Sequence, residues 1–386
     1  MSDVTLECAM TLEIDKHGID MTGLVTVPED GWEVPLAGES RFTWEYDDGR
    51  DRLLSLYQKG KDKQWDAQYR VDWDAEVDLD NPLGIPDIAI PIYESRTFQD
   101  RVKDDPKELG RLRRAMACSQ LSQFLHGEQG AMITAAHIVE TVPDLDSKFY
   151  AATQTMDEAR HVEVFDKFLR DVVGMEPYPL SRPLATLLEQ TLSDSRWDMP
   201  YLGMQVLIEG LALAAFGGMR DTAGNRVAKQ VVAYVMQDEA RHVAFGRIAL
   251  KDAYAELSEA ERDEREQFVV EACYLMRNRF RSADLWERLG YDVPDCLDAI
   301  DNSPNGKYFN QRLFTRIVPC IKDIGLWGPR VRAAFDDMGV LDFAAANLDG
   351  LMADDERTAE DLDAEDKAVA ARTAEVEEAI KVGAAG

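Results

Sequence analysis

Apolar residues recur at helical spacing along most of the chain after residue 105. Breaks rich in proline, glycine or aspartate interrupt this pattern at 142–147, 174–183, 193–200 and 217–225. The breaks leave four long helices and one short helix, which we expect at 106–140, 147–173, 200–217 and 225–257, and at 184–192. Ser147 is the expected N-cap of the second long helix. The pattern therefore predicts an all-α protein with a four-helix bundle over 105–257.

The segments on either side of this centre have different patterns. Residues 1–100 combine β-prone runs, a helical stretch interrupted at Gly60 and a proline-rich stretch. We expect them to form an irregular or extended cover with one helix, wrapped around the bundle. Residues 258–350 show further amphipathic helices, the first expected over 258–289. Residues 352–386 are acidic and alanine-rich, which predicts a flexible tail.

A repeated motif lies inside the predicted bundle. The hexapeptide DEARHV occurs at 157–162 and again at 238–243, and the two copies are 81 residues apart. A single glutamate lies thirty residues before the glutamate of each copy, and these two residues, Glu128 and Glu209, are also 81 apart. The constant spacing indicates two related helical hairpins, each with one glutamate on its first helix and a Glu-x-x-His pair on its second.

The residue types in this pattern indicate a metal site. A glutamate and a histidine three residues apart lie on one face of a helix and can reach the same ion. A single Glu-x-x-His pair most often faces solvent, but apolar residues such as Phe124, Leu207 and Val235 surround these positions. Burying four carboxylates without compensation is costly, and two divalent ions would compensate for them. Oxygen and imidazole ligands favour iron or manganese. The predicted ligands are Glu128, Glu158, His161, Glu209, Glu239 and His242.

Composition excludes several classes of protein. The formal net charge of −30 disfavours nucleic acid and anionic membranes as partners. We find no apolar run of membrane-spanning length and no signal sequence, so a cytoplasmic protein is expected. The five cysteines are scattered and contain no CxxC pair, which argues against a disulfide framework or a rubredoxin-type iron centre.

The doubled pattern of a glutamate followed by DExRH, over about 105–250, resembles the ferritin-like di-iron carboxylate proteins. The DExRH form is similar to that of the branch that activates oxygen, which includes multicomponent hydroxylases, acyl desaturases, arylamine N-oxygenases and ribonucleotide reductase small subunits. The resemblance implies a ferritin-like bundle in which the six predicted residues bind two iron ions, with manganese or a mixed iron–manganese pair as alternatives. It also implies that Asp157 and Asp238 hydrogen-bond the ligand histidines across the site and that Arg160 and Arg241 support these aspartates.

From this resemblance we expect an O2-dependent di-iron oxygenase that oxidises a small organic substrate by C–H hydroxylation or N-oxygenation. The chain carries no flavin or iron–sulfur motif, so an external electron donor, a ferredoxin or a flavin reductase, is expected; a homodimer is left open. Two alternatives are a radical-forming or ligand-binding oxidase related to the reductase small subunits, and a non-enzymatic iron-handling protein. Residues one turn from the ligands are candidate walls of a substrate cavity: Phe124, Met132, Phe165, Gln205, Leu213, Phe216 and Val235.

At three of these positions the residue differs from the one found in a particular subgroup of the di-iron proteins. Phe165 stands where the reductase small subunits have their radical tyrosine. Leu213 stands where the hydroxylases have a threonine, and Val235 where the arylamine N-oxygenases have an additional histidine. No subgroup therefore matches residue for residue.

Overall fold

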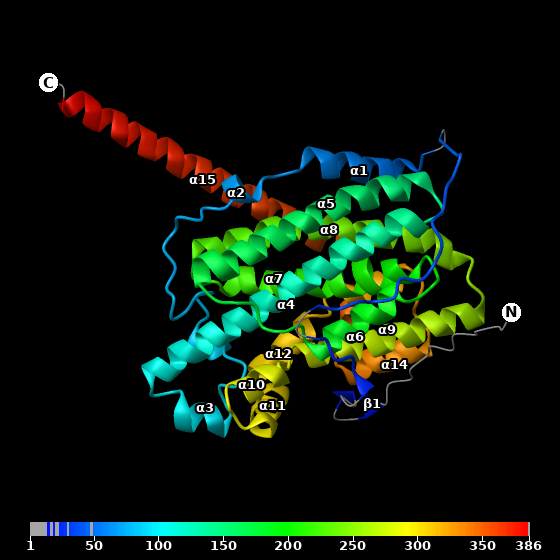
Figure 1. The fold of residues 1–386 in the computed structure, drawn as a ribbon, viewed down its shortest axis with the longest axis horizontal. Helices are drawn as coiled ribbons and strands as arrows, with labels where there is room; N and C mark the ends of the chain where they lie inside the picture. The colour runs from blue at the N-terminus through cyan, green and yellow to red at the C-terminus, as the bar shows by residue number, and fades with distance from the viewer. Residues whose placement is uncertain (1–13, 16–17, 20–22, 29–30, 47–48, 385–386) are drawn as a thin grey trace.

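A computed structural model describes residues 14–15, 18–19, 23–28, 31–46 and 49–384. Its centre is a four-helix bundle of long helices that run side by side (Figure 1). They are α4 (Pro106–Thr141), α5 (Leu145–Lys167) continued by η3 (Phe168–Val173), η4 (Tyr201–Ile208) continued by α7 (Glu209–Thr222), and α8 (Arg226–Ala255). The predicted all-α fold and its four central helices are confirmed.

Side chains of aspartate and asparagine set the starts of three of these helices. Asp105 accepts hydrogen bonds from the first turn of α4, and Asn225 accepts one from the backbone N–H of Ala228 in α8. The N-cap of α5 is Asp144, which accepts a hydrogen bond from the backbone N–H of Ser147. The expectation that Ser147 itself is the cap was wrong, because this residue lies buried within the first turn.

Two segments of the bundle are π-helical. The first, η3, ends α5, and the second, η4, leads directly into Glu209 at the start of α7. A π-helical segment inserts one residue into the helical register and is frequently found at functional sites. Every residue of η4 is buried, and Glu209 follows it directly.

Glycines allow close contact between central helices. A Cβ atom at Gly130 of α4 would lie 2.6 Å from Leu188 Cδ2 of α6 (Arg182–Leu192), the helix that links the two halves of the bundle. One at Gly246 of α8 would lie 2.6 Å from Gln205 Cβ of η4. Larger side chains would push these helices apart.

The N-terminal segment wraps around the bundle (Figure 1). A short antiparallel pair, β1 (Ile14–Asp15) and β2 (Gly18–Ile19), aligns Ile14 with Ile19. It is followed by α1 (Asp51–Asp62), α2 (Ala67–Arg70), η2 (Asp87–Ala89) and α3 (Arg96–Arg101). Helix α1 packs across α5 and α8 on one side of the bundle, and β1 and α3 lie on the opposite side (Figure 1). Gly60 does not interrupt this helix as predicted; it is buried inside α1, where a Cβ atom would lie 3.0 Å from Thr153 Cγ2.

Further helices pack on the other side of the bundle. They are α9 (Glu259–Arg279), α10 (Ala283–Arg288), α11 (Val293–Asn302), α12 (Pro304–Arg312), α13 (Ile317–Asp323), α14 (Pro329–Asp337) and η5 (Leu341–Ala345). The predicted helix over 258–289 is divided into α9 and α10, because Ser282 adopts a left-handed conformation with φ of 54°.

The acidic C-terminal segment forms α15 (Leu348–Ala384), whose far end projects from the body of the protein (Figure 1). Its first half packs against α8, with Asp355 only 2% exposed. The Asp355 carboxylate lies 2.6 Å from Arg316 Nη2 and 3.2 Å from Arg220 Nη1. Ion pairing therefore holds the first turns of a segment that the sequence indicated to be flexible.

One stretch of the described chain, Tyr201–Thr222, is long and apolar enough to cross a membrane, contrary to the expectation that no apolar run reaches this length. However, 83% of the apolar 18-residue segment within this stretch is buried inside the protein. The stretch comprises η4 and α7, so its apolar character is explained by its place in the bundle core.

Candidate metal centre

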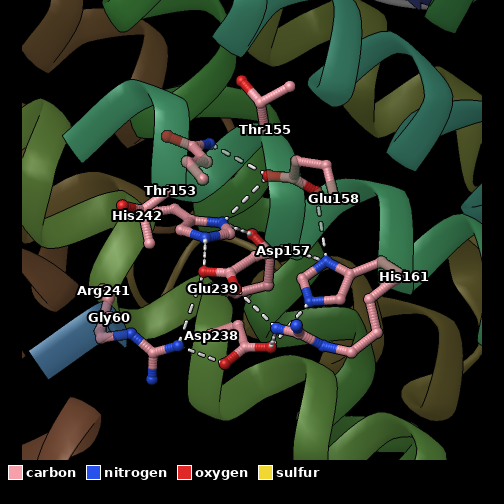
Figure 2. Close-up of polar contacts among 12 residues, drawn as sticks. Gly60, Thr153, Thr155, Asp157, Glu158, His161, Asp238, Glu239, Arg241 and His242 are labelled. Atoms are coloured by element: carbon pink, nitrogen blue, oxygen red, sulfur yellow. Dashed lines mark hydrogen bonds and ion pairs between the residues drawn. The ribbon is translucent and has the colours of Figure 1, made fainter. Parts of the chain in front are cut away.

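The four bundle helices bring the six predicted ligands together. Glu128 comes from α4, Glu158 and His161 come from α5, and the other three come from α7 and α8. Each of the six residues is at most 5% exposed. Figure 2 shows two of the glutamates and both imidazoles facing one another at the centre of the bundle. The buried environment inferred from the apolar flanking residues is therefore present.

The six residues form two overlapping groups. One contains Glu128, Glu158, His161 and Glu239, and the other contains Glu158, Glu209, Glu239 and His242. In each group, one potential ligand atom from every residue lies within 4.8 Å of all the others. Two glutamates, one from α5 and one from α8, belong to both groups.

These shared glutamates each direct one oxygen towards each imidazole. Glu158 places Oε2 3.2 Å from His161 Nδ1 and Oε1 3.0 Å from His242 Nδ1. Glu239 places Oε1 3.2 Å from His161 Nδ1 and Oε2 3.4 Å from His242 Nδ1. Glu128 Oε2 lies 3.3 Å from His161 Nδ1 and belongs to that side alone. The arrangement has two carboxylates between the imidazoles and one at each end.

An outer layer of charged groups orients both histidines (Figure 2). His161 Nε2 lies 3.1 Å from Asp238 Oδ2, and His242 Nε2 lies 3.3 Å from Asp157 Oδ2. Each aspartate thus pairs with the histidine of the other DEARHV copy, as the resemblance implies. When an aspartate accepts the Nε2–H, the Nδ1 atom is the one that faces the glutamates.

The two arginines of the repeat bind these aspartates. Arg160 donates to Asp157 Oδ1 at 2.6 Å and to Asp238 Oδ2 at 2.8 Å, and so links the two DEARHV copies. Arg241 donates to Asp238 Oδ1. Both arginines are buried, so neither faces solvent.

Three further residues contact the cluster and were missed by sequence reasoning. Trp65 Nε1 donates to Asp238 Oδ2 at 2.8 Å, and Gln64 Nε2 donates to Asp157 Oδ1 at 2.7 Å. Both belong to the N-terminal cover, far from the repeat in sequence. Gln154 Nε2 donates to Glu158 Oε1 at 3.0 Å and to a Glu209 oxygen at 2.7 Å. Its position one turn before Glu158 was a signal that could have identified it.

Burial and mutual repulsion change the pKa values of the cluster. Burial, reinforced by the charge of Glu239, raises the pKa of Glu128 and of Glu209 well above the usual value. Burial alone would lower the pKa of His161 and His242. Hydrogen bonds and charges from the surrounding carboxylates outweigh this effect and raise both pKa values well above the usual one. Without metal, the cluster therefore retains protons that isolated side chains would lose.

The cluster also contains buried polar atoms that make no hydrogen bond. In the described part of the chain they are both oxygens of Glu239, Glu209 Oε2 and His242 Nδ1, and of these Glu209 Oε2 lacks even the ion-pair contacts that Glu239 and His242 make. Buried polar atoms are normally paired, and unpaired ones in a native structure mark a missing partner such as an ion. The three residues that carry these atoms all belong to the second group of potential ligands. The residues present therefore fit a pair of divalent metal ions.

We expect iron(II) binding to release protons and to strengthen as pH rises from the ordinary pKa values of glutamate and histidine towards the raised values of the cluster. The raised pKa values of Glu128, Glu209, His161 and His242 mean that folding without metal takes up protons, so the metal-free protein loses stability as pH rises through this range. Metal displaces these protons, and affinity should increase about tenfold per pH unit for each proton displaced. Calorimetry in two buffers of different ionisation enthalpy measures the release, and equal heats in both would contradict it.

Residues 47–325, more than half of the chain, match the family model described as p-aminobenzoate N-oxygenase AurF. The chain belongs to this family. It is therefore an oxidoreductase with a di-iron cofactor, and it uses O2 and a small-molecule substrate. Membership in the AurF family confirms the resemblance to the ferritin-like di-iron oxygenases. No curated protein matches the chain.

Solved structures with detectable similarity include R2-like ligand-binding oxidases. One, with an aerobically reconstituted metal cofactor after photoconversion, is 15% identical over 73% of this chain and 100% of its own, with a TM-score of 0.48. A variant with an anaerobically reconstituted Mn/Fe cofactor is 17% identical over 74% of this chain and 96% of its own, with a TM-score of 0.46.

Aromatic residues dominate the region of the predicted cavity walls. The ring centroids of Phe124, Phe165 and Phe216 lie 4.6 to 5.6 Å apart, so the three rings pack on one another. Gln205, Leu213 and Val235 are also buried, whereas Met132 is half-buried. That these seven residues line a substrate cavity stays a prediction.

Proposed function

We propose that this protein is an O2-dependent di-iron oxygenase that oxidises the amino group of a small aromatic amine. The observation that carries the proposal is the pair of buried Glu/His groups inside a chain that belongs to the AurF family. One iron ion would be held by Glu128, Glu158, His161 and Glu239, and the second by Glu158, Glu209, Glu239 and His242. A mixed manganese–iron pair is compatible with the same donor set.

Bound iron supplies the reduction of O2 and the transfer of one oxygen atom to the substrate. The remaining contributions come from the chain. Asp157 and Asp238 fix the direction of both imidazoles, and the aromatic cluster excludes water from the same region. The negative shared carboxylates compensate for the charge of the ions.

The balance of electrons requires a donor. Oxidation of an amine to a hydroxylamine removes two electrons, whereas reduction of O2, with one oxygen atom retained in the product and the other released as water, takes up four. Two electrons and two protons must therefore enter from outside in each cycle. We propose a cytoplasmic ferredoxin or flavin reductase as their source, because the sequence contains no flavin or iron–sulfur motif of its own.

Single-turnover oxidation tests this proposal. The protein is loaded anaerobically with two equivalents of iron(II), mixed with p-aminobenzoate and exposed to O2. We expect stoichiometric N-oxygenated product by mass spectrometry. Many irons mineralised per chain would instead favour the iron-handling protein, and a tyrosyl radical signal without product would favour the reductase-like oxidase. The phenylalanine at position 165, where the reductases have their radical tyrosine, argues against that second outcome.

A further inference from the structure

The two copies of the repeat differ one turn before the ligand glutamates. Gln154 lies four residues before the shared glutamate of α5, and Val235 holds the equivalent position 81 residues later in α8. Gln205 lies four residues before Glu209, and the equivalent residue 81 positions earlier, in α4, is Phe124. Two of the four positions therefore carry amides, and the other two carry apolar side chains.

Both amides lie at the end of the cluster that contains Glu209. Gln154 is fully buried, and its Nε2 donates hydrogen bonds to Glu209 Oε1 at 2.7 Å and to Glu158 Oε1 at 3.0 Å. This Glu158 oxygen is the one that lies 3.0 Å from His242 Nδ1. Gln205 Nε2 donates to Gln154 Oε1 at 3.4 Å. Both hydrogen bonds of the Gln154 amide nitrogen therefore end on the His242 side of the cluster.

The hydrogen bond from Gln154 leaves Oε2 as the unpaired oxygen of Glu209. Oε1 accepts this bond, whereas Oε2 is buried and makes no hydrogen bond in the described part of the chain. A hydrogen bond to a carboxylate is stronger than one between neutral groups, and it restricts rotation of the carboxylate plane. Gln154 therefore holds Glu209 with Oε2 in a fixed direction before any ion binds.

The terminal glutamate at the opposite end has no such support. Among the described residues, Glu128 hydrogen-bonds only to His161, with 3.3 Å between Oε2 and Nδ1. Both of these residues belong to the first group of potential ligands, so an ion bound there would replace their contact. The two imidazoles do not differ in this way, since an aspartate holds each of them. The difference between the two ends therefore lies in the glutamates.

Packing of the core does not require these amides. Val235 and Phe124 fill the equivalent positions with buried apolar side chains, whereas an amide buried with unsatisfied atoms costs free energy. Gln205 Oε1 is buried without a hydrogen bond in the described chain. Gly246 provides the room for Gln205, because a Cβ atom there would lie 2.6 Å from Gln205 Cβ, and the equivalent residue in the first copy is Phe165. The presence of two amides at these positions therefore points to a role at the metal centre.

We propose that Gln154 is a positioning residue that makes the two metal positions unequal. The Glu209 position, formed by the second group of potential ligands, binds the first ion tightly. The Glu128 position, formed by the first group, binds the second ion more weakly and exchanges it faster. A ligand that is oriented in advance loses less freedom when an ion binds, and hydrogen bonds from an outer residue strengthen a metal site. The inference rests on the six-ligand centre of the proposed function and adds the order in which its ions bind.

Anaerobic calorimetric titration with iron(II) of variants that keep one position tests the inference. Glu128→Ala keeps the Glu209 position, and Glu209→Ala keeps the Glu128 position. We expect Glu128→Ala to bind its ion about 10- to 100-fold more tightly than Glu209→Ala does. Gln154→Val, which introduces the residue of the equivalent position, should weaken binding by about the same factor when it is combined with Glu128→Ala. Combined with Glu209→Ala, it should leave the affinity unchanged.

Gln230→Val is the matched control. Gln230 is also fully buried, but its amide contacts Asp366 of α15 and the backbone of Asp72 instead of a metal ligand, so this variant should leave iron affinity unchanged. A measurement on the wild-type protein needs no variant to fold. One equivalent of Mössbauer-active iron(II) should give one quadrupole doublet, and a second equivalent should add a second doublet.

Three results would overturn the inference. They are equal affinities in Glu128→Ala and Glu209→Ala, equal weakening by Gln154→Val in both backgrounds, and two doublets of equal area after one equivalent of iron(II). Failure of the proposed function would look different, because the two positions would remain unequal while exposure to O2 gave no N-oxygenated product.

Discussion

Substitution of either shared glutamate, Glu158→Ala or Glu239→Ala, is expected to abolish binding of both iron ions and reduce product formation to background. Both residues belong to both groups of potential ligands. Glu128→Ala and Glu209→Ala each remove a residue of one group only, so these variants should retain about one iron per chain. Loss of an outer hydrogen-bond partner of a ligand already costs about 10- to 100-fold in affinity, and loss of a ligand held in common should cost more. Iron content per chain and single-turnover yield measure the effect.

A matched control is available on the same helix as the first shared glutamate. Glu163 lies five residues after Glu158 in α5 and is exposed, so Glu163→Gln should keep two irons and full product yield. Metal-free Glu239→Ala should also unfold at a higher temperature than the metal-free wild-type protein, because it relieves the repulsion between the buried carboxylate of Glu239 and those of Glu128 and Glu209. Equal iron content in all four ligand variants would refute the assignment of shared and terminal residues.

Asp238→Ala is expected to destabilise the protein by about 3–5 kcal/mol and to weaken iron binding by about 10- to 100-fold. The carboxylate of Asp238 accepts hydrogen bonds from Trp65, Arg160 and Arg241 and pairs with His161 Nε2. Its removal leaves two buried guanidinium groups short of a partner and frees the imidazole to rotate. Urea-induced unfolding gives the first quantity, and titration with iron(II) gives the second.

The comparison variant for this experiment is Asp252→Ala, which removes an exposed aspartate from the same helix, α8. It should change the free energy of unfolding by less than about 0.5 kcal/mol. The pKa of Asp238 is well below its usual value, because the charges of Arg241 and His161 and the hydrogen bond to His161 outweigh burial. Its contribution to stability is therefore present at neutral pH and is lost only as pH falls through that low folded-state pKa. An unfolding free energy unchanged by Asp238→Ala at pH 7 would show that the outer layer is not coupled to stability.

Position 235 distinguishes this chain from the arylamine N-oxygenase pattern. A valine stands where that pattern has an additional histidine, yet the family match extends across this position. His126 and His137, the two other described histidines, lie in neither group of potential ligands. We therefore propose a site of six protein ligands with two histidines, and the metal stoichiometry and single-turnover experiments described above test whether this set is sufficient.

The sequence alone was sufficient to predict the all-α fold, the four bundle helices and the six residues that converge. Helical spacing determines which residues share a face of a helix. Because the residues around the two DEARHV copies and around the glutamates thirty residues before them are apolar, these faces were expected to point into the bundle together. The starts and ends of helices were predicted to within a few residues, with errors where a cap or a left-handed residue changed the boundary, as at Asp144 and Ser282.

Tertiary structure decided how these faces meet. Glu158 and Glu239 both lie between the two imidazoles. This position depends on how α5 and α8 are rotated and shifted relative to each other, and no local sequence pattern specifies that packing. Trp65 reaches Asp238 across 173 residues of sequence, and Arg279 contacts α4 across 156. Periodicity determines the face of a helix on which a side chain lies, but only the packing of distant segments determines its partner.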